Sequence, residues 1–203
     1  MQAEPPNKVG SIILASSSNY RKQQLQQLNL QFSCERPDID ESPLANEEMQ
    51  ATAIRLASQK AHAVAAKHRD EQIIIGADQT AELHGSILGK PHSIENAIAQ
   101  LEQCSGQEVI FYSGICVLNS VTNLCLKTTV TTVVKFRSLS KQQIRHYIDR
   151  DSPLDCAGSF KCEGLGIALF ESIESRDPTA LIGLPLITLT DMLLQMGVDP
   201  LSY

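Results

Sequence analysis

The chain has 203 residues, a formal net charge of -6, 42% hydrophobic residues and 20% charged residues. This composition is ordinary for a globular domain and unlike that of disordered chains. An acidic chain lacks the clustered Lys and Arg of a general nucleic-acid-binding protein, so we expect no nucleic-acid partner. No segment approaches the roughly 20 consecutive apolar residues that span a bilayer, so we expect no membrane partner.

The N-terminal residues and the cysteines bear on where the protein works. Residues 1–10 contain one Lys, two Pro and no apolar stretch, so they predict a flexible lead-in and not a secretory signal. Without a signal, the six cysteines are typical of reduced thiols, and the absence of a Cys-x-x-Cys pair argues against zinc. We therefore expect a cytoplasmic protein in which residues 11–203 form a single domain.

The first two predicted elements have the geometry of a phosphate site. Residues 11–15 (SIILA) predict a buried strand, residues 20–28 predict a helix, and the Ser-Ser-Ser-Asn sequence between them is rich in N-cap residues. A strand that leads directly into a helix N-terminus points free backbone N–H groups at the turn, where phosphate binds in many proteins. Arg21 opposes the dipole of this helix, and an anion shared with the helix terminus would account for it.

Helices and strands alternate along the rest of the chain. The pattern predicts helices over 46–68, 93–104, 140–150 and from 183 to before 197, and strands over 73–75, 108–119, 124–137 and 160–170. A turn at Gly85-Ser86 marks a short hairpin, and residues 108–137 predict a long antiparallel hairpin. The sequence therefore predicts a three-layer α/β domain of mixed α+β character, with a central mixed sheet and helices on both sides.

Two charged residues stand where apolar residues are expected. Lys60 falls on the apolar face of the helix over 46–68, either as a Lys at the edge of the core or as an ammonium aimed into a polar cleft. Asp78 follows the apolar strand over 73–75, beyond which ligand sites of α/β sheets lie. Asp78 is therefore either a turn residue or a carboxylate that holds a metal or removes a proton.

Further charged residues add to this pattern. Asp38, Asp40 and Glu41 are either a solvated acidic turn or oxygen ligands for Mg²⁺ or Mn²⁺. Lys90 stands in a tight turn between a Gly and a Pro, which alone is a weak signal. Carboxylates, cations and a helix N-terminus are together the components of metal-assisted phosphoryl or nucleotidyl chemistry.

Several motifs in matching order resemble the Maf family of nucleotide pyrophosphatases, from Ile12 to Met196. The matching segments are LASSSNYR (14–21), DIDE (38–41), QKA (59–61), IGADQ (75–79), GKP (89–91), YSG (112–114), AGSFKCEGLG (157–166) and GLPL (183–186). One departure is Asn19, where the family usually has Pro. Asn is favoured near a helix start, so we expect little consequence.

The resemblance implies a cytoplasmic α/β enzyme, often dimeric, with its active-site cleft between two lobes. It implies hydrolysis of a nucleoside triphosphate to the monophosphate and pyrophosphate, with a divalent cation, Mg²⁺ or Mn²⁺. By the resemblance, Asp78 matches the proton acceptor and Glu41 an acidic residue of the metal site, to which we also assign Asp78. The residues that match positions around the phosphates are Ser16, Arg21, Lys60 and Lys90, of which we expect Lys60 and Lys90 to be catalytic.

Three positions divide the family by substrate, and here they are Tyr20, Gln79 and Glu163. The branch that acts on dTTP and UTP has Arg, Thr and Gln there, whereas the branch that acts on 7-methyl-GTP has an aromatic residue, Gln and Glu. The chain looks like the second branch. A 7-methylguanine ring is positively charged and stacks on an electron-rich ring such as Tyr20, and Glu163 can accept both donors of the guanine edge.

Two other functions stay open. A pyrophosphatase for UTP, dTTP or modified pyrimidines would catalyse the same reaction on a different base, although Gln79 and Glu163 argue against this substrate. A nucleotide-binding regulator of cell division with little turnover belongs to another class, since members of the family are associated with septum inhibition. The carboxylates Asp78 and Glu41 and the cation Lys60 favour an enzyme.

Overall fold

The computed structural model describes residues 10–202, so the lead-in expected at the N-terminus lies outside the described residues except for Gly10. The strands are β1 (Ser11–Ala15), β2 (Phe32–Cys34), β3 (Gln72–Leu83), β4 (Ser86–Ile87), β5 (Glu108–Asn119), β6 (Cys125–Phe136) and β7 (Phe170–Ser175). The α-helices are α1 (Asn19–Gln26), α2 (Met49–Ala65), α3 (Ile94–Cys104), α4 (Lys141–Asp151) and α5 (Leu186–Gln195). Short 3₁₀ turns cover Ala157–Ser159, Leu165–Leu169 and Ala180–Ile182.

All the strands join one mixed sheet in the order β2-β1-β3-β5-β6-β7, with β4 paired to the end of β3. Strand β1 runs parallel to β2 and β3, whereas β3, β5, β6 and β7 pair antiparallel. The long hairpin expected over 108–137 is confirmed as β5 and β6. The mixed sheet flanked by helices confirms the predicted fold class. Within residues 10–202, none of the helices combines the length and the apolar character needed to cross a bilayer.

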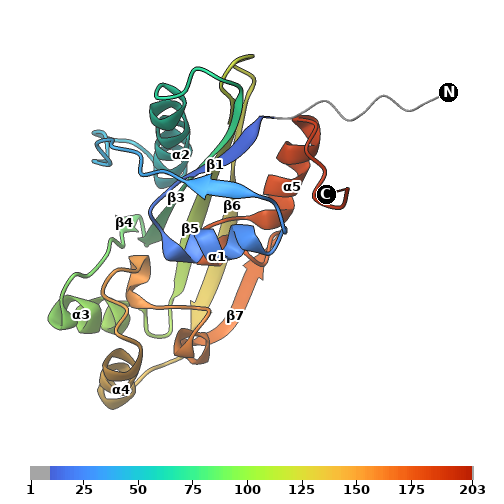
Figure 1. Ribbon diagram of the computed structural model, residues 1–203. Coiled ribbons are helices and arrows are strands. Elements are labelled where there is room, and N and C mark those ends of the chain that lie inside the picture. The colour runs from blue at the N-terminus through green and yellow to red at the C-terminus, as the bar shows by residue number, and fades with distance from the viewer. Residues whose placement is uncertain (1–9, 203) are drawn as a thin grey trace.

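Helices cover both faces of the sheet at one end of the molecule (Figure 1). Helix α2 packs on one face, against Ile13 and Ile74, and helices α1 and α5 pack on the other face, against Ile73 and Ile75. This three-layer part is called the α2 lobe below. At the other end, α3 and α4 pack with Phe111 and the far ends of β3, β5 and β6, and this part is called the α3–α4 lobe.

Two glycines allow α2 to lie directly on the sheet. A Cβ added to Gly76 of β3 would lie 2.1 Å from the Ala57 carbonyl oxygen, and one added to Gly114 of β5 would lie 2.2 Å from that of Ala53. No side chain fits in so narrow a gap. Because Gly114 pairs with Asp78 across the ladder, the same contact brings α2 close to Asp78.

Several element boundaries differ from the prediction. Helix α2 begins only at Met49, because residues 35–48 form an irregular segment ahead of it. Strand β3 does not stop near residue 75 but pairs with β5 as far as Glu82, so Asp78 lies in mid-strand. The short strand β2 was not predicted, since three residues give too weak a pattern.

The strand predicted over 160–170 is wrong for most of its length. The chain forms 3₁₀ turns there, and strand β7 begins only at Phe170. The reason is local: the Gly164 and Gly166 N–H groups both donate to the Lys161 carbonyl oxygen, at 3.2 and 3.1 Å, and so turn the chain. A Cβ on Gly166 would lie 2.4 Å from the Lys161 carbonyl oxygen, so this segment folds back on itself.

Candidate active site

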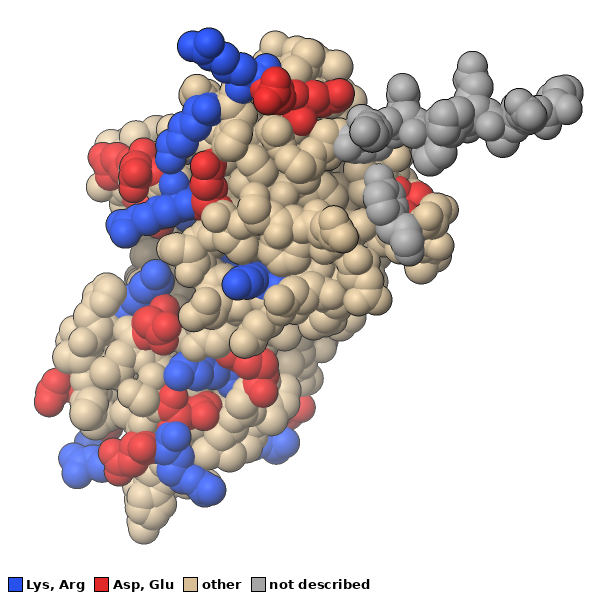
Figure 2. All heavy atoms as spheres, in the orientation of Figure 1, with Lys and Arg blue, Asp and Glu red and all other residues tan. Residues whose placement is uncertain are grey.

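A cleft of about 1200 Å³ lies between the two lobes. In the space-filling view the surface is indented between them, and Lys and Arg side chains are interspersed with Asp and Glu over this face (Figure 2). The β1–α1 turn, the irregular segment 35–48, α2 and β3 line the cleft from one side, and residues 155–163 line it from the other. All the predicted site residues line it: Ser16, Tyr20, Arg21, Glu41, Lys60, Asp78, Gln79, Lys90 and Glu163.

A buried ammonium between two carboxylates forms the centre of the cleft. Lys60 Nζ lies 2.6 Å from Asp78 Oδ1 and 2.9 Å from Glu41 Oε1. The Lys60 and Asp78 side chains are 6% and 10% exposed, whereas that of Glu41 is 56% exposed. A buried charge requires such partners. Of the two interpretations of Lys60, the structure therefore favours the ammonium that points into a polar cleft.

The position of Asp78 follows from the alternation of side chains along β3. Ile74, Gly76 and Asp78 point to the face that α2 covers, while Ala77 and Gln79 point to the other face. Asp78 is therefore not a turn residue. Its carboxylate lies under α2 because of its register in the strand, next to the Lys60 ammonium.

The β1–α1 turn presents a helix N-terminus to the cleft. The Ser18 hydroxyl caps α1 by accepting from the Arg21 backbone N–H at 3.4 Å, and the buried Ser16 hydroxyl accepts from the Ser18 N–H at 3.1 Å. The Arg21 side chain turns back, and its Nε donates to the Gly183 carbonyl at 3.0 Å. Burial lowers the pKa of Arg21, whereas the carboxylates of Asp78 and Glu41 act in the opposite direction.

The Gln79 side chain is engaged by the fold. Its Nε2 donates to Ser113 Oγ at 3.0 Å and to the carbonyl oxygens of Ala180 and Leu181, both at 3.1 Å. Leu181, Ile182 and Gly183 line the cleft, and the Gly183 carbonyl accepts from Arg21. Gln79 therefore holds the turn that supports Arg21, and its amide hydrogens are directed at the Ser113 hydroxyl and at backbone carbonyls.

Two carboxylates, Asp155 and Glu163, lie near Tyr20 at one end of the cleft. Burial raises the pKa of the Tyr20 phenol, and Cys156, Asp155 and Glu163 reinforce the shift. Burial also raises the pKa of the Cys156 and Cys162 thiols to about 12, so both are protonated at neutral pH. Both thiols are therefore poor nucleophiles at neutral pH.

Lys90 lies at the rim of the cleft, on the α3–α4 lobe. It is exposed, and within the described range 10–202 its ammonium takes part in no hydrogen bond or ion pair. The turn that carries it is anchored where the His92 N–H donates to the Leu154 carbonyl at 3.1 Å. Lys90 is thus a free cation on the side of the cleft opposite Lys60.

The acidic residues 38–41 do not gather into a three-carboxylate site. Asp38 pairs with Arg36 at 3.5 Å, and Asp40 accepts from the Ser42 N–H at 2.9 Å. Glu41 alone reaches the centre of the cleft, where it approaches Asp78 across Lys60. No group of three or more His, Cys, Asp or Glu that could hold a metal occurs among residues 10–202.

The comparison with protein families shows to which family the chain belongs. The family described as "Maf-like protein" matches residues 11–196. The chain belongs to the Maf family. Every matching segment except YSG (112–114) contributes at least one residue to the lining of one cleft, although the segments are spread from residue 14 to residue 186.

Three relatives are each called 7-methyl-GTP pyrophosphatase. The relative from Saccharophagus degradans is 50% identical over 197 residues, which cover 97% of this Maf chain and 100% of the relative. Those from Pseudomonas aeruginosa and Pseudomonas putida are 49% and 50% identical, covering 93% and 92% of this chain and 97% of each relative. A HAM1 protein from Coxiella burnetii has a similar fold, with a TM-score of 0.51 at 16% identity over 92% of this chain and 99% of its own.

Sequence reasoning missed several residues that line the cleft in this Maf protein. They include Arg36, Thr80, His92, Asp155 and Ile182. Asp155 is the clearest omission, since it adds a carboxylate beside Tyr20. A single Asp in a loop gives no periodic or spacing signal, so only the fold could place it there.

Proposed function

We propose that this Maf protein is a nucleoside triphosphate pyrophosphatase that hydrolyses 7-methyl-GTP to 7-methyl-GMP and pyrophosphate. The observation that carries the proposal is the buried Lys60 held between Asp78 and Glu41, at the centre of a cleft with Tyr20 and Glu163 at one end. The names of three relatives that cover nearly the whole chain support the same substrate.

The cations of the cleft account for binding of a triphosphate. Lys60 and Arg21 approach from the α2 lobe and Lys90 from the α3–α4 lobe, so positive charge faces the substrate from both sides. The N-terminus of α1 adds backbone N–H groups near Ser16. Within residues 10–202, neither Nη atom of Arg21 donates a hydrogen bond to the protein, which leaves both for an anion.

Asp78 is the group to which we assign proton removal. It is the less exposed of the two carboxylates at Lys60, and a carboxylate held this firmly can accept a proton from a water without moving. The oxygen of this water forms a bond to the α-phosphorus, and the bond from that phosphorus to the bridging oxygen breaks. Pyrophosphate leaves, and Lys60, Lys90 and Arg21 stabilise the charge on its oxygens.

A divalent cation, Mg²⁺ or Mn²⁺, fits the donor set of this cleft. Mg²⁺ is commonly held by one or two carboxylates together with substrate phosphates and water. Glu41 and Asp78 supply two carboxylates, and no third side chain of this kind joins them within the described part of the chain. When bound, the cation would neutralise part of the triphosphate charge.

The other end of the cleft fits a cationic base. Tyr20 offers an aromatic face for stacking, and the Glu163 and Asp155 carboxylates lie close enough to act on its phenol. A 7-methylguanine ring carries a positive charge and two adjacent N–H donors, which a carboxylate can accept together. A uracil or thymine ring would leave the Glu163 carboxylate unpaired. The same carboxylate therefore favours 7-methylguanine and disfavours uracil and thymine.

The decisive experiment is pyrophosphate release with Mg²⁺ from 7-methyl-GTP, GTP, UTP, dTTP and CTP. A preference for 7-methyl-GTP supports the proposal. A preference for UTP or dTTP keeps the chemistry and overturns the substrate. Binding without release, with Mn²⁺ also tested, would favour the nucleotide-binding regulator.

The place of action and the oligomeric state belong to the same proposal. We place the enzyme in the cytoplasm, where its nucleotide substrate would be found, and fractionation of cells tests this. The homodimer implied by the family resemblance stays a prediction, for which sedimentation equilibrium of the purified chain is the test.

A further inference from the structure

The residues before α2 carry Glu41 to the cleft without support from regular structure. Residues 35–48 connect β2 to α2 and contain neither helix nor strand. Within the described residues, the polar contacts that tie residues 37–47 to the rest of the fold come from Arg36, Lys60, Thr52 and Arg55. The pair formed by Arg36 and Asp38 is highly exposed and lies at the rim. The position of Glu41 therefore depends on α2.

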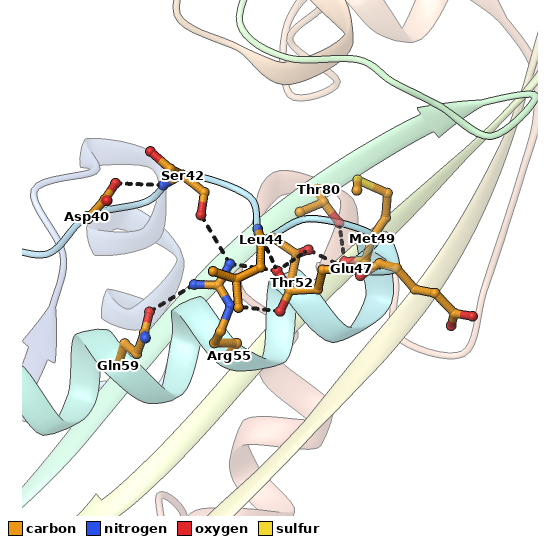
Figure 3. Close-up of polar contacts among 10 residues, drawn as sticks. Asp40, Ser42, Leu44, Glu47, Met49, Thr52, Arg55, Gln59 and Thr80 are labelled. Carbon is orange, nitrogen blue, oxygen red and sulfur yellow. Dashed lines mark hydrogen bonds and ion pairs between the residues drawn. The ribbon is translucent and has the colours of Figure 1, made fainter.

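Arg55 of α2 makes the most extensive of these contacts (Figure 3). Its Nε and Nη2 donate to the two carboxylate oxygens of Glu47 at 2.7 and 2.6 Å. Nη2 also donates to the Ser42 carbonyl at 3.2 Å, and Nη1 donates to Gln59 Oε1 at 3.1 Å. One guanidinium thus joins both ends of the stretch from residue 42 to residue 47. These contacts are called the Arg55 clasp below.

Glu47 is built into the clasp as a charged acceptor. Its Oε2 also accepts from Thr52 Oγ1 at 2.9 Å and from the Leu44 N–H at 3.4 Å. The Arg55 and Glu47 side chains are only 19% and 12% exposed. The hydrogen bonds from Arg55 are the largest cause that lowers the pKa of Glu47, to about 2. A shielded, two-point pair of this kind is more rigid than an ordinary surface ion pair.

The clasp lies beside the cleft and not in it. Thr52, Leu56 and Lys60 of α2 line the cleft, but Arg55 does not. Arg55 grips the carbonyl of Ser42, the residue directly after Glu41, and the next turn of the same helix carries Lys60. Helix α2 packs tightly on the sheet at Gly76 and Gly114. The clasp therefore ties the segment that carries Glu41 to a rigid part of the fold.

We propose that Arg55 is a positioning residue, whose clasp on Glu47 and the Ser42 carbonyl holds Glu41 at Lys60 and Asp78. The consequence for turnover rests on the proposed function, whereas the positioning itself does not. Lys cannot replace Arg55 here, because one ammonium does not supply the planar donors that reach Glu47, Ser42 and Gln59 together.

The first test measures the segment without any nucleotide. The chain contains no Trp, so Leu44→Trp, at a residue that is 58% exposed, provides a single fluorescent reporter within residues 37–47. We expect Arg55→Gln and Arg55→Lys to add a fast component to the anisotropy decay of this Trp. Lys135→Gln is the matched control, since it removes an exposed ion pair with Glu171, 3.2 Å long, on a distant part of the sheet.

The second test asks whether Arg55 acts through Glu41. We expect Arg55→Gln to lower kcat/KM for pyrophosphate release about tenfold, the size usual for groups coupled by contact. In a Glu41→Gln background the same change should cause no further loss. Losses that multiply independently, or an unchanged anisotropy decay in Arg55→Gln, would overturn the proposal.

Two controls keep the outcomes distinct. If Arg55→Gln fails to fold, Glu47→Gln weakens the same clasp, because its amide offers Arg55 one acceptor oxygen instead of two, and both measurements can be made on this variant. If the unchanged protein releases no pyrophosphate from any nucleotide, the proposed function fails, and the anisotropy decay alone decides whether Arg55 holds the segment.

Discussion

Lys60 of α2 and Asp78 of β3 form a buried ion pair, with Nζ 2.6 Å from Oδ1. The pair exists because Gly114, which stands opposite Asp78 in the ladder, lets α2 approach the sheet. The backbone packing of the fold and the chemistry of the cleft therefore depend on the same contact.

Asp78→Asn tests the assignment of the proton acceptor. An amide is nearly the same size and still offers an oxygen to Lys60 Nζ, but it accepts no proton at neutral pH. We expect a loss of pyrophosphate release of about 10²- to 10⁴-fold, as is usual when a general base is removed. Circular dichroism and nucleotide binding should be retained. A variant with near-native turnover would remove Asp78 from this role.

Gly114→Ala tests the contact between α2 and the sheet. The added Cβ would lie 2.2 Å from the Ala53 carbonyl oxygen, which belongs to backbone and cannot turn away. We expect the free energy of unfolding in urea to fall by about 1–3 kcal/mol, as for other overpacked sites. Gly89→Ala is the control, since no atom lies within 4 Å of its added Cβ. Equal stability of the two variants would contradict the close packing described here.

Glu163→Gln together with Tyr20→Arg tests the selection of a cationic base. The two changes remove the carboxylate acceptor and the aromatic face, and they place a cation where the ring would stack. We expect the preference for 7-methyl-GTP over UTP in kcat/KM to fall by at least about tenfold, since one lost polar contact of this kind is worth that much. Glu174→Gln, exposed on β7 outside the cleft, is the control. Unchanged selectivity would refute the assignment.

The low pKa of Glu47 predicts how stability depends on pH. Hydrogen bonds from Arg55 lower its pKa from 4.5 to about 2 in the folded protein. A depressed folded-state pKa stabilises the fold above the unfolded value, and this contribution is lost as pH falls from 4.5 towards 2. Urea unfolding at intervals across this range should show a smaller loss in Glu47→Gln than in the parent chain. Parallel curves for the two proteins would contradict the contribution of Glu47.

Much of the candidate site could be predicted from the sequence, because its motifs are short and local. The strand and helix start around Ser16 and the Lys60 position on an apolar helix face are visible within single elements. The sequence pointed to Asp78 but not to its position in mid-strand. The length of β3 is decided by its pairing with β5, a long-range contact about 36 residues away in sequence. Arg55 gave no signal either, since its partner Glu47 lies in a segment without periodicity.

Strands β3 and β5 have 12 residues each, and each supplies apolar side chains to both lobes. Over residues 73–82 the floor of the cleft is thus a continuous hydrogen-bonded ladder with β5, and not a linker at which the lobes could rotate as separate bodies. A change in the width of the cleft must be taken up as added twist or bend distributed along this ladder. Elasticity of the sheet, and not the freedom of a hinge, then governs how far the two sides can close on a substrate.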